Sequence, residues 1–244
     1  MVHTNSNHSK QKPVKAMILA AGRGKRLRPI TDKVPKPLVE VCQKPLIEYH
    51  LEKLAQAGVQ EVVINHAWLG HKLEEQLGDG SRWQLKIHYS PEPEGGLETA
   101  GGIIKALPLL GDAPFIVING DVFCDFDFGD LTAKAQKMAE QQEDIQGFLY
   151  LVPSPEHNPK GDFGLNEDGV VQAEGPFTFA GLSILKPELF LGMEVDFMPL
   201  APILREAMLK GQIAGKVQDG FWSDVGTIER LDNTEQYWLN KAML

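Results

Sequence analysis

The residues most suited to chemistry lie near the amino end, where "AGRGKRLRPIT" (21–31) brings glycines and cations together. Gly22 and Gly24 allow backbone N–H groups to approach a ligand closely, and cationic side chains neutralise phosphate charge. Between positions 23 and 36 stand six cations and one acid, although the whole chain has a formal charge of −9. We therefore predict that this segment binds a small polyanion. A solvated basic loop is the alternative, because most charge runs are solvated.

Two common phosphate-binding motifs do not fit this loop. A mononucleotide P-loop has a glycine five positions before its Gly-Lys pair and Ser or Thr after it, but Leu19 and Arg26 stand at those places. The dinucleotide fingerprint has a third glycine three positions after the second, but Leu27 stands there. What remains is a glycine-rich, cationic loop that follows a strand and precedes "PKPL" (35–38).

The segments that must position this loop alternate between strand-like and helix-like patterns. Short apolar runs typical of buried strands alternate with segments whose apolar residues recur at helical spacing. This order implies mostly parallel strands joined by right-handed crossovers, with ligands at the carboxyl ends of the strands. The glycine-rich loop is therefore expected at a ligand-binding edge. The expected strands are 15–21, 61–67, 85–90 and 115–119, and the expected helices are 45–58, 69–78 and 100–110.

The second half of the chain continues the α/β pattern. It contains no internal repeat and no Ser/Gly-rich linker, so we predict a flexible tail at 1–13 and a single domain over 14–244. Segments 91–102 and 153–164 are rich in Pro and Gly, which is typical of long functional loops. The patterns predict helices near 131–141, over 199–211 and from about 227, and strands near 146–153 and 178–185.

Composition excludes several classes of protein. The acidic balance argues against a broad nucleic-acid-binding surface. No apolar run approaches the roughly 20 residues that span a bilayer, and the amino end lacks the apolar middle of a secretory signal, so we expect a cytoplasmic protein without a membrane partner. Cys42 and Cys124 lie far apart and are expected to be reduced, buried thiols. The histidines predicted to be packing or surface residues rather than metal ligands are His50, His66, His71 and His88.

The glycine-rich loop and the residues after it carry a specific signature. The sequence resembles the sugar-1-phosphate nucleotidyltransferases, whose signature is close to Gly-x-Gly-x-Arg-Leu-x-Pro-x-Thr followed by Pro-Lys-Pro. The resemblance extends over nearly the whole chain after the tail, through segments such as "YSPE", "NGDV", "GDF", "FAGLSIL" and "WSDVGTIERL". The residues that match the signature are Gly22, Gly24, Arg26, Leu27, Pro29, Thr31, Pro35, Lys36 and Pro37.

This resemblance implies a fold and an activity. The implied fold is a Rossmann-like three-layer α/β/α nucleotidyltransferase fold of the glycosyltransferase A type, with a mainly parallel mixed sheet. The implied activity is Mg²⁺-dependent transfer of UMP from UTP to N-acetylmuramic acid 1-phosphate, in peptidoglycan recycling, by a monomer. The first alternative is uridylyl, thymidylyl or guanylyl transfer to glucose-, mannose- or N-acetylglucosamine-1-phosphate. The second is a non-catalytic nucleotide-binding regulator.

The resemblance also implies roles for individual residues. Asp121 and Asp224 are expected to hold Mg²⁺, which suits the preference of a hard cation for carboxylate oxygens; an Asn-Gly-Asp turn is the structural alternative for Asp121. Arg26 and Lys36 are the expected catalytic cations. The expected sugar-phosphate contacts are Asn119, Asp162 and Gly181. The expected nucleotide contacts are Ala20, Ala21, Gly22, Gly24, Lys25, Arg26, Lys36, Glu98, Gly101 and Asn119.

Two parts of this assignment have competing interpretations. Arg23, Lys25 and Arg28 could supply electrostatic background only. Glu98 or Thr99 could cap a helix instead of contacting the nucleotide, because such residues are common at helix starts. In the same stretch the sequence departs from the family pattern by an apparent one-residue insertion, which puts the register of the base contacts in doubt.

Overall fold

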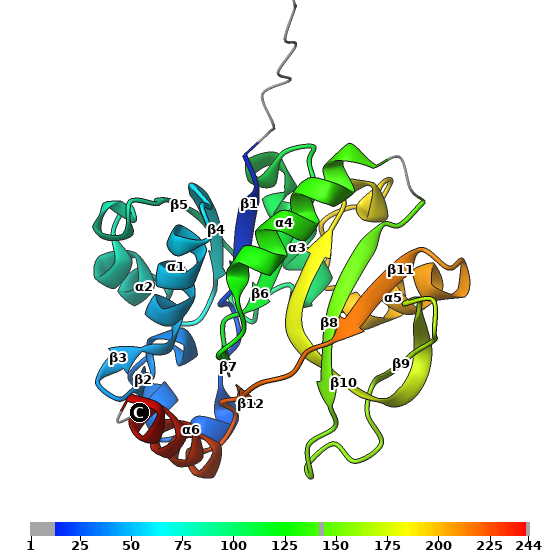
Figure 1. The fold of residues 1–244 in the computed structure, drawn as a ribbon. Coiled ribbons are helices and arrows are strands. Elements are labelled where there is room, and N and C mark those ends of the chain that lie inside the picture. The colour runs from blue at the N-terminus through cyan, green and yellow to red at the C-terminus, as the bar shows by residue number, and fades with distance from the viewer. Residues whose placement is uncertain (1–12, 142–143, 243–244) are drawn as a thin grey trace, which may run out of the picture.

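The computed structural model describes residues 13–141 and 144–242. Figure 1 shows a twisted central sheet whose eight strands follow the order β11-β8-β10-β6-β1-β4-β5, with β9 paired to β10. The predicted tail at 1–13 lies almost entirely outside the described residues, and the single domain over 14–244 stays a prediction. Within the described residues, no helix is long and apolar enough to cross a membrane.

The four strands expected in the first half of the chain are confirmed, and all four run parallel. In β1, Ala16 lies opposite Val62 on one side and opposite Ile116 on the other. Residues on both faces of β1, β4 and β6 are buried, which explains why these three strands contain continuous apolar runs, whereas the edge strand β5 alternates between apolar and polar residues. The bounds are β1 (Lys15–Leu19), β4 (Glu61–His66), β5 (Lys86–Pro91) and β6 (Phe115–Asn119).

Helices cover both faces of the sheet, so the expected three-layer α/β/α architecture is confirmed. Alternate residues of β1 show the division: Ile18 packs in the core beneath α1, α2 and α4, whereas Met17 packs in the core beneath α3 and α5. The expected helices are all present. Their bounds are α1 (Leu46–Gln56), α2 (Gly70–Leu77), α3 (Glu98–Leu110), α4 (Phe128–Glu140), α5 (Leu200–Leu209) and α6 (Ile228–Ala242).

The second half of the sheet is mixed and differs in detail from the prediction. β10 (Val171–Leu185) begins well before the expected start near 178, and it runs antiparallel to β6 and β8. A bulge between Phe179 and Ser183 interrupts its pairing with β8. Sequence patterns predicted β8 (Gly147–Pro153) but not β9 (Phe163–Leu165) or β11 (Ile213–Val217).

Short elements outside the main sheet bring distant parts of the chain together. β7 (Val122–Cys124) pairs with β12 (Trp222–Asp224), and β2 (Glu40–Val41) pairs with β3 (Lys44–Pro45). In Figure 1 the chain leaves β11, crosses to β12 and ends in α6, beside the segment that contains β2 and β3. The 3-10 helices are η1 (Lys25–Leu27), η2 (Ile30–Asp32), η3 (Lys36–Leu38), η4 (Ser81–Trp83) and η5 (Pro187–Phe190).

A third apolar cluster anchors the glycine-rich loop to the carboxyl-terminal part of the chain. Leu27 is fully buried and packs in a cluster that includes Phe123 from β7, Val225 after β12 and Leu231 from α6. Burying a leucine side chain contributes about 1.5–3 kcal/mol, so this contact holds the loop firmly against the ends of β7 and β12. The signature leucine is therefore structural.

Candidate active site

A cavity of about 790 Å³ opens at the carboxyl ends of β1, β4 and β6. Leu19, Asn65 and Asn119, the residues at or next to the ends of these three strands, line it. The cavity lies where a mainly parallel sheet gathers its ligands, as the strand order predicted. Its size is ample for a mononucleotide-sized ligand.

The glycine-rich loop forms one wall of this cavity. Ala20, Ala21, Gly22 and Lys25 line it, in agreement with their predicted place near a ligand. Arg23 also lines it, but its guanidinium is fixed within the chain: it lies 3.7 Å from the ring centroid of Trp68, and its Nη1 donates to Thr31 O at 2.7 Å. Arg23 is therefore more than electrostatic background, because it ties the loop to Trp68 and to η2.

Gly24 joins the loop to the lysine that follows it. Its φ is +65°, and a Cβ at this position would lie 3.0 Å from Thr31 Cγ2 and 3.1 Å from Lys36 Cβ. Thr31 is fully buried and its Oγ1 donates to Gly24 O at 2.8 Å. Gly24 does not line the cavity; it permits the close packing that places Lys36 there.

Lys36 points into the site and meets one of the two predicted metal ligands. The residue is buried between Pro35 and Pro37, with only 10% of its side chain exposed, and its Nζ donates to Asp121 Oδ2 at 2.6 Å. Both residues line the cavity. The structure therefore brings together a cation and a carboxylate that lie 85 positions apart and that the family resemblance implied for one site.

The two predicted metal ligands lie side by side at the ends of β7 and β12. Asp224 is the last residue of β12 and lies opposite Val122, and Val225 N donates to Asp121 O at 2.9 Å. The described residues contain no group of three or more His, Cys, Asp and Glu that could enclose a metal. Two carboxylates nevertheless fit Mg²⁺, which is usually held by one or two carboxylates together with substrate phosphates.

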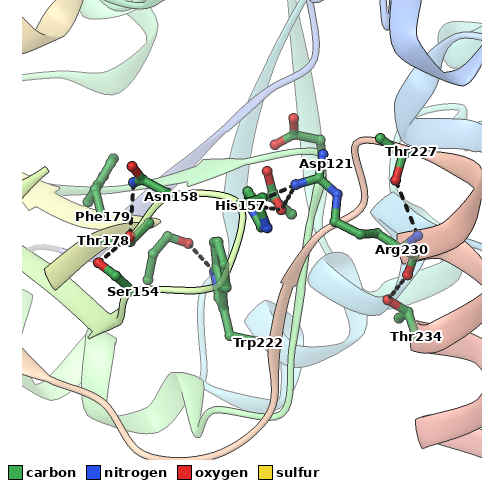
Figure 2. Close-up of polar contacts among 12 residues, drawn as sticks. Asp121, Ser154, His157, Asn158, Thr178, Phe179, Trp222, Thr227, Arg230 and Thr234 are labelled. Atoms are coloured by element: carbon green, nitrogen blue, oxygen red, sulfur yellow. Dashed lines mark hydrogen bonds and ion pairs between the residues drawn. The ribbon is translucent and has the colours of Figure 1, made fainter. Parts of the chain in front are cut away.

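Sequence analysis missed two residues beside Asp224. Arg230, in the first turns of α6, donates from Nη1 to Asp224 Oδ1 at 2.7 Å, and the same Nη1 lies 2.7 Å from His157 Nε2 (Figure 2). His157 Nε2 is 3.2 Å from Asp224 Oδ1. The position of Arg230, six residues after Asp224, was the only available signal, because nothing in the sequence relates His157 to either of them.

Arg26 lies on this same side of the site and not in the cavity. It is exposed, and its Nη2 would lie 3.1 Å from a Cβ built on Gly226. Arg230 Nη2 approaches the same point even more closely. Gly226 therefore leaves room for two guanidinium groups beside the Asp121 and Asp224 carboxylates.

A chain of hydrogen bonds, also missed from the sequence, begins at the buried residue Asn65, which lines the cavity. Asn65 accepts a hydrogen bond from Ala20 N at 2.9 Å and donates to Glu92 Oε1 at 2.7 Å. Glu92 Oε2 in turn accepts from Leu97 N at 2.7 Å. This chain ties the glycine-rich loop to the segment before α3. An asparagine that ends an otherwise apolar strand was the signal that could have identified Asn65.

The start of α3 presents Glu98 and Thr99 to the cavity. Neither residue caps the helix, because the N-cap is Leu97 and no side chain supplies a cap hydrogen bond. Glu98 has a φ of +59°, an uncommon backbone conformation for a residue with a side chain that is often kept at ligand-binding positions. Gly101 does not line the cavity: a Cβ there would lie 2.0 Å from Asp196 O, so this glycine serves close packing of α3 instead.

The residues expected to contact the sugar take different places. Asn119 lines the cavity, and Gly181, with a φ of +74°, makes room for it, because a Cβ at Gly181 would lie 2.9 Å from Asn119 Nδ2. Asp162 is engaged within the chain: its Oδ1 accepts from Asn158 Nδ2 at 3.0 Å and its Oδ2 from Phe179 N at 2.9 Å. Asp162 thus fixes the β8–β9 loop, and a direct sugar contact by it stays a prediction.

The cysteines and the other histidines do not form a site. Cys42 and Cys124 are both free, and burial raises the pKa of the Cys124 thiol to about 11. Burial lowers the pKa of His50 to about 4, so this side chain is neutral at pH 7. His66 and His88 each pair with a glutamate, at 2.8 and 2.9 Å.

Comparisons with known proteins agree with this geometry. A family model described as nucleotidyl transferase matches residues 15–172. The N-acetylmuramate alpha-1-phosphate uridylyltransferase of Neisseria meningitidis serogroup B is 52% identical over 227 residues, which cover 91% of this chain and 97% of that protein. The protein of the same name from Caulobacter vibrioides is 33% identical, over 88% of this chain and 93% of its own.

Solved structures share the fold at low sequence identity. A UDP-glucose pyrophosphorylase solved in complex with UDP-glucose superimposes with a TM-score of 0.75 and 21% identity, covering 94% of this chain and 100% of that chain.

Proposed function

The chain belongs to the nucleotidyl transferase family, and from this premise we propose that it transfers UMP from UTP to N-acetylmuramic acid 1-phosphate, releasing pyrophosphate and forming the UDP-sugar. Its class is that of a sugar-1-phosphate nucleotidyltransferase. The observation that carries the choice of substrates is the 52% identity, over nearly the full length of both chains, to an N-acetylmuramate alpha-1-phosphate uridylyltransferase. The geometry of the site supports the reaction type.

The glycine-rich loop suits a triphosphate. Ala20, Ala21, Gly22 and Lys25 line the cavity, and Gly24 has the left-handed conformation that turns successive backbone N–H groups towards an anion. We assign Ala20, Ala21, Gly22 and Lys25 to the phosphates of UTP, with Gly24 setting the course of the loop. Arg26 lies beyond the cavity, on the Asp224 side, where its planar guanidinium would pair two oxygens of the departing pyrophosphate.

We assign Lys36 and the two aspartates to the point where the substrates react. The attack brings two anions together, so positive charge must reduce the repulsion between the α-phosphate and the incoming phosphate. The Lys36 ammonium lies at the edge of the cavity and supplies one positive charge there. Asp121 and Asp224 would hold Mg²⁺, which when bound supplies further charge neutralisation and orients the phosphates.

The two substrates enter from different sides. The cavity accounts for the nucleotide, with Glu98, Thr99 and Asn119 placed to contact the nucleoside. The β8–β9 loop, which contains His157 and Asp162, contacts Asp224 through His157, and neither His157 nor Asp162 lines the cavity. An acceptor that approaches along this loop reaches the two aspartates opposite the nucleotide, as an in-line displacement requires.

Pyrophosphate release tests the proposal. The purified chain is incubated with UTP and, separately, with N-acetylmuramic acid 1-phosphate, N-acetylglucosamine 1-phosphate, glucose 1-phosphate and mannose 1-phosphate, with Mg²⁺ or with EDTA. We expect release that requires Mg²⁺ and is fastest with the muramic acid derivative. Faster release with another sugar would replace the proposed acceptor. Failure with every sugar, also with dTTP and GTP, would leave a nucleotide-binding regulator as the function.

A further inference from the structure

The Arg230 side chain is held beside Asp224 in an unusual environment. Only 15% of the side chain is exposed, and its Nη1 donates to Asp224 Oδ1 at 2.7 Å and lies 2.7 Å from His157 Nε2. Its Nε is buried and has no hydrogen-bond partner among the described residues. A buried guanidinium N–H without a partner costs free energy, so the observed arrangement does not use the full bonding capacity of this residue.

The backbone around Arg230 is fixed, which limits any movement to the side chain. Arg230 N donates to Thr227 Oγ1 at 3.3 Å, and Thr234 Oγ1 donates to Arg230 O at 2.6 Å, as Figure 2 shows. Gly226 is buried next to the guanidinium, and a Cβ built there would collide with Arg230 Nη2, so the guanidinium already packs against the Gly226 backbone. An exchange of partners by the guanidinium is therefore a rotation of the side chain while α6 stays in place.

Asp224 Oδ1 cannot serve Arg230 and a divalent cation equally well. Mg²⁺ binds carboxylate oxygens at about 2.0–2.1 Å, and one of the two Asp224 oxygens, Oδ1, already accepts a charge-assisted hydrogen bond from Arg230. A metal on either oxygen of this carboxylate would lie close to the guanidinium, and the two positive charges would repel each other. That repulsion disappears if an anion binds between them.

The location of Arg230 indicates which anion this is. Arg230 and His157 do not line the nucleotide cavity, whereas Lys36 and Asp121 do. His157 lies in the β8–β9 loop, along which the proposed function has the acceptor approach, and it contacts Asp224. An oxyanion of the acceptor is therefore the group that comes within reach of Arg230, and a guanidinium can bind a phosphate or a carboxylate with two parallel hydrogen bonds.

We propose that Arg230 is an acceptor-binding residue that serves as the counter-ion of Asp224 in the metal-free protein and transfers to an oxyanion of the acceptor sugar phosphate when a divalent cation occupies Asp224. The inference rests on the proposed function. The oxyanion has two possible sources in N-acetylmuramic acid 1-phosphate, which are the phosphate and the lactyl carboxylate. A purely structural ion pair between α6 and β12 is the competing explanation.

The change in metal affinity when Arg230 is replaced, measured without substrates, separates these two explanations, because they predict changes in opposite directions. Arg230→Met keeps the apolar stem and removes the competing cation, so Mn²⁺, measured by electron paramagnetic resonance, should bind about threefold or more tightly. A structural role predicts weaker or unchanged binding, because Asp224 would lose its support. Lys210→Met removes the same charge from an exposed position on the surface after α5, and its Mn²⁺ affinity should equal that of the wild type.

Steady-state kinetics tests the acceptor half of the proposal. For Arg230→Met we expect the KM for N-acetylmuramic acid 1-phosphate to rise about tenfold or more, with the KM for UTP within about twofold of the wild type. Arg230→Lys keeps the charge but not the paired donors, so its KM for N-acetylmuramic acid 1-phosphate should lie between those of the wild type and Arg230→Met. An equal rise with N-acetylglucosamine 1-phosphate assigns the phosphate, and a rise confined to the muramic acid derivative assigns the carboxylate.

Two results would overturn the proposal: an acceptor KM that is unchanged in Arg230→Met with both sugars, or Mn²⁺ binding that is unchanged or weaker in a variant that keeps the circular dichroism spectrum of the wild type. These two results can be told apart from a failure of the proposed function. If the proposed function is wrong, the wild type itself will convert neither sugar, and the Mn²⁺ titration will still decide whether Arg230 competes with the metal.

Discussion

Replacing Lys36 with methionine removes one positive charge from the reaction centre and keeps the length of the side chain. The structure assigns Lys36 two contributions of different size. In the metal-free protein its Nζ pairs with Asp121, whose side chain is 36% exposed, so the pair stabilises the fold by about 1 kcal/mol or less. In the proposed reaction the same charge would face the reacting phosphate in the transition state, where loss of one such group typically lowers kcat by about 10² to 10³.

The expected result is therefore a large loss of rate with little loss of stability. In Lys36→Met, kcat should fall by about 10² to 10³, which corresponds to about 3–4 kcal/mol, and the KM for UTP should rise by less than about tenfold. The Tm should fall by no more than about 4 °C, because 1 kcal/mol shifts the Tm of a chain of this size by about 2–4 °C. Pyrophosphate release at saturating substrates and a thermal scan measure both quantities.

A matched variant isolates the effect of position from the effect of charge. Lys33→Met removes an equal charge from an exposed residue of the same segment, and its kcat should stay within about twofold of the wild type. If Lys36→Met retained a kcat within about fivefold of the wild type, Lys36 would not face the reacting phosphate. If its Tm fell by more than about 10 °C, the loss of rate would reflect unfolding and the argument from charge would be wrong.

Three further predictions follow from the site and the core. Asp121→Ala and Asp224→Ala should each lower turnover by about 10³ or more and weaken Mn²⁺ binding, and near-normal turnover in either variant would contradict the metal assignment. Asn65→Leu removes two hydrogen bonds of a buried side chain, one of them to a partly buried carboxylate, and should lower the free energy of unfolding by about 2–4 kcal/mol in urea titrations and raise the KM for UTP. The pKa of His50 is lowered to about 4 by burial and by the nearby Lys53 cation, so the unfolded chain takes up a proton below its own pKa of about 6.5 and the folded chain does not. The free energy of unfolding should therefore fall by about 2–3 kcal/mol between pH 7.5 and 4.5 because of this group. In urea titrations at these two pH values, His50→Leu should lack that part of the decrease. If the variant shows the same pH dependence as the wild type, His50 is not buried as a neutral group.

Elements with a single strong pattern were predictable from the sequence. The apolar run 15–19 is buried on both faces of the sheet, and the spacing of Leu46, Ile47, Leu51 and Leu54 fits a helix with one buried face, so local pattern and tertiary packing agree. Strands that depend on a partner were not predictable. β12 has three residues, all partly exposed, and exists because β7 lies beside it.

Some residues of the candidate site were likewise predictable from sequence motifs, and others became apparent only from the packing of distant segments. The signature and the two aspartates were visible as sequence motifs, and the structure places Lys36, Asp121 and Asp224 together. The contact between His157 and Arg230 joins residues 73 positions apart in two segments without a shared pattern, so only the packing of the β8–β9 loop against α6 reveals it. Gly101 was assigned to the nucleotide because glycine permits close approach, but the backbone that approaches it is that of Asp196.

Competition between acceptors tests the central claim most directly. Equal concentrations of the 1-phosphates of N-acetylmuramic acid, N-acetylglucosamine, glucose and mannose are incubated with limiting UTP and Mg²⁺, and the UDP-sugars are identified by mass spectrometry. Because all acceptors compete for one enzyme, the product ratio reports the ratio of their kcat/KM values. We expect UDP-N-acetylmuramic acid to be the main product, at about tenfold or more over any other. A different main product, or no UDP-sugar at all, would contradict it.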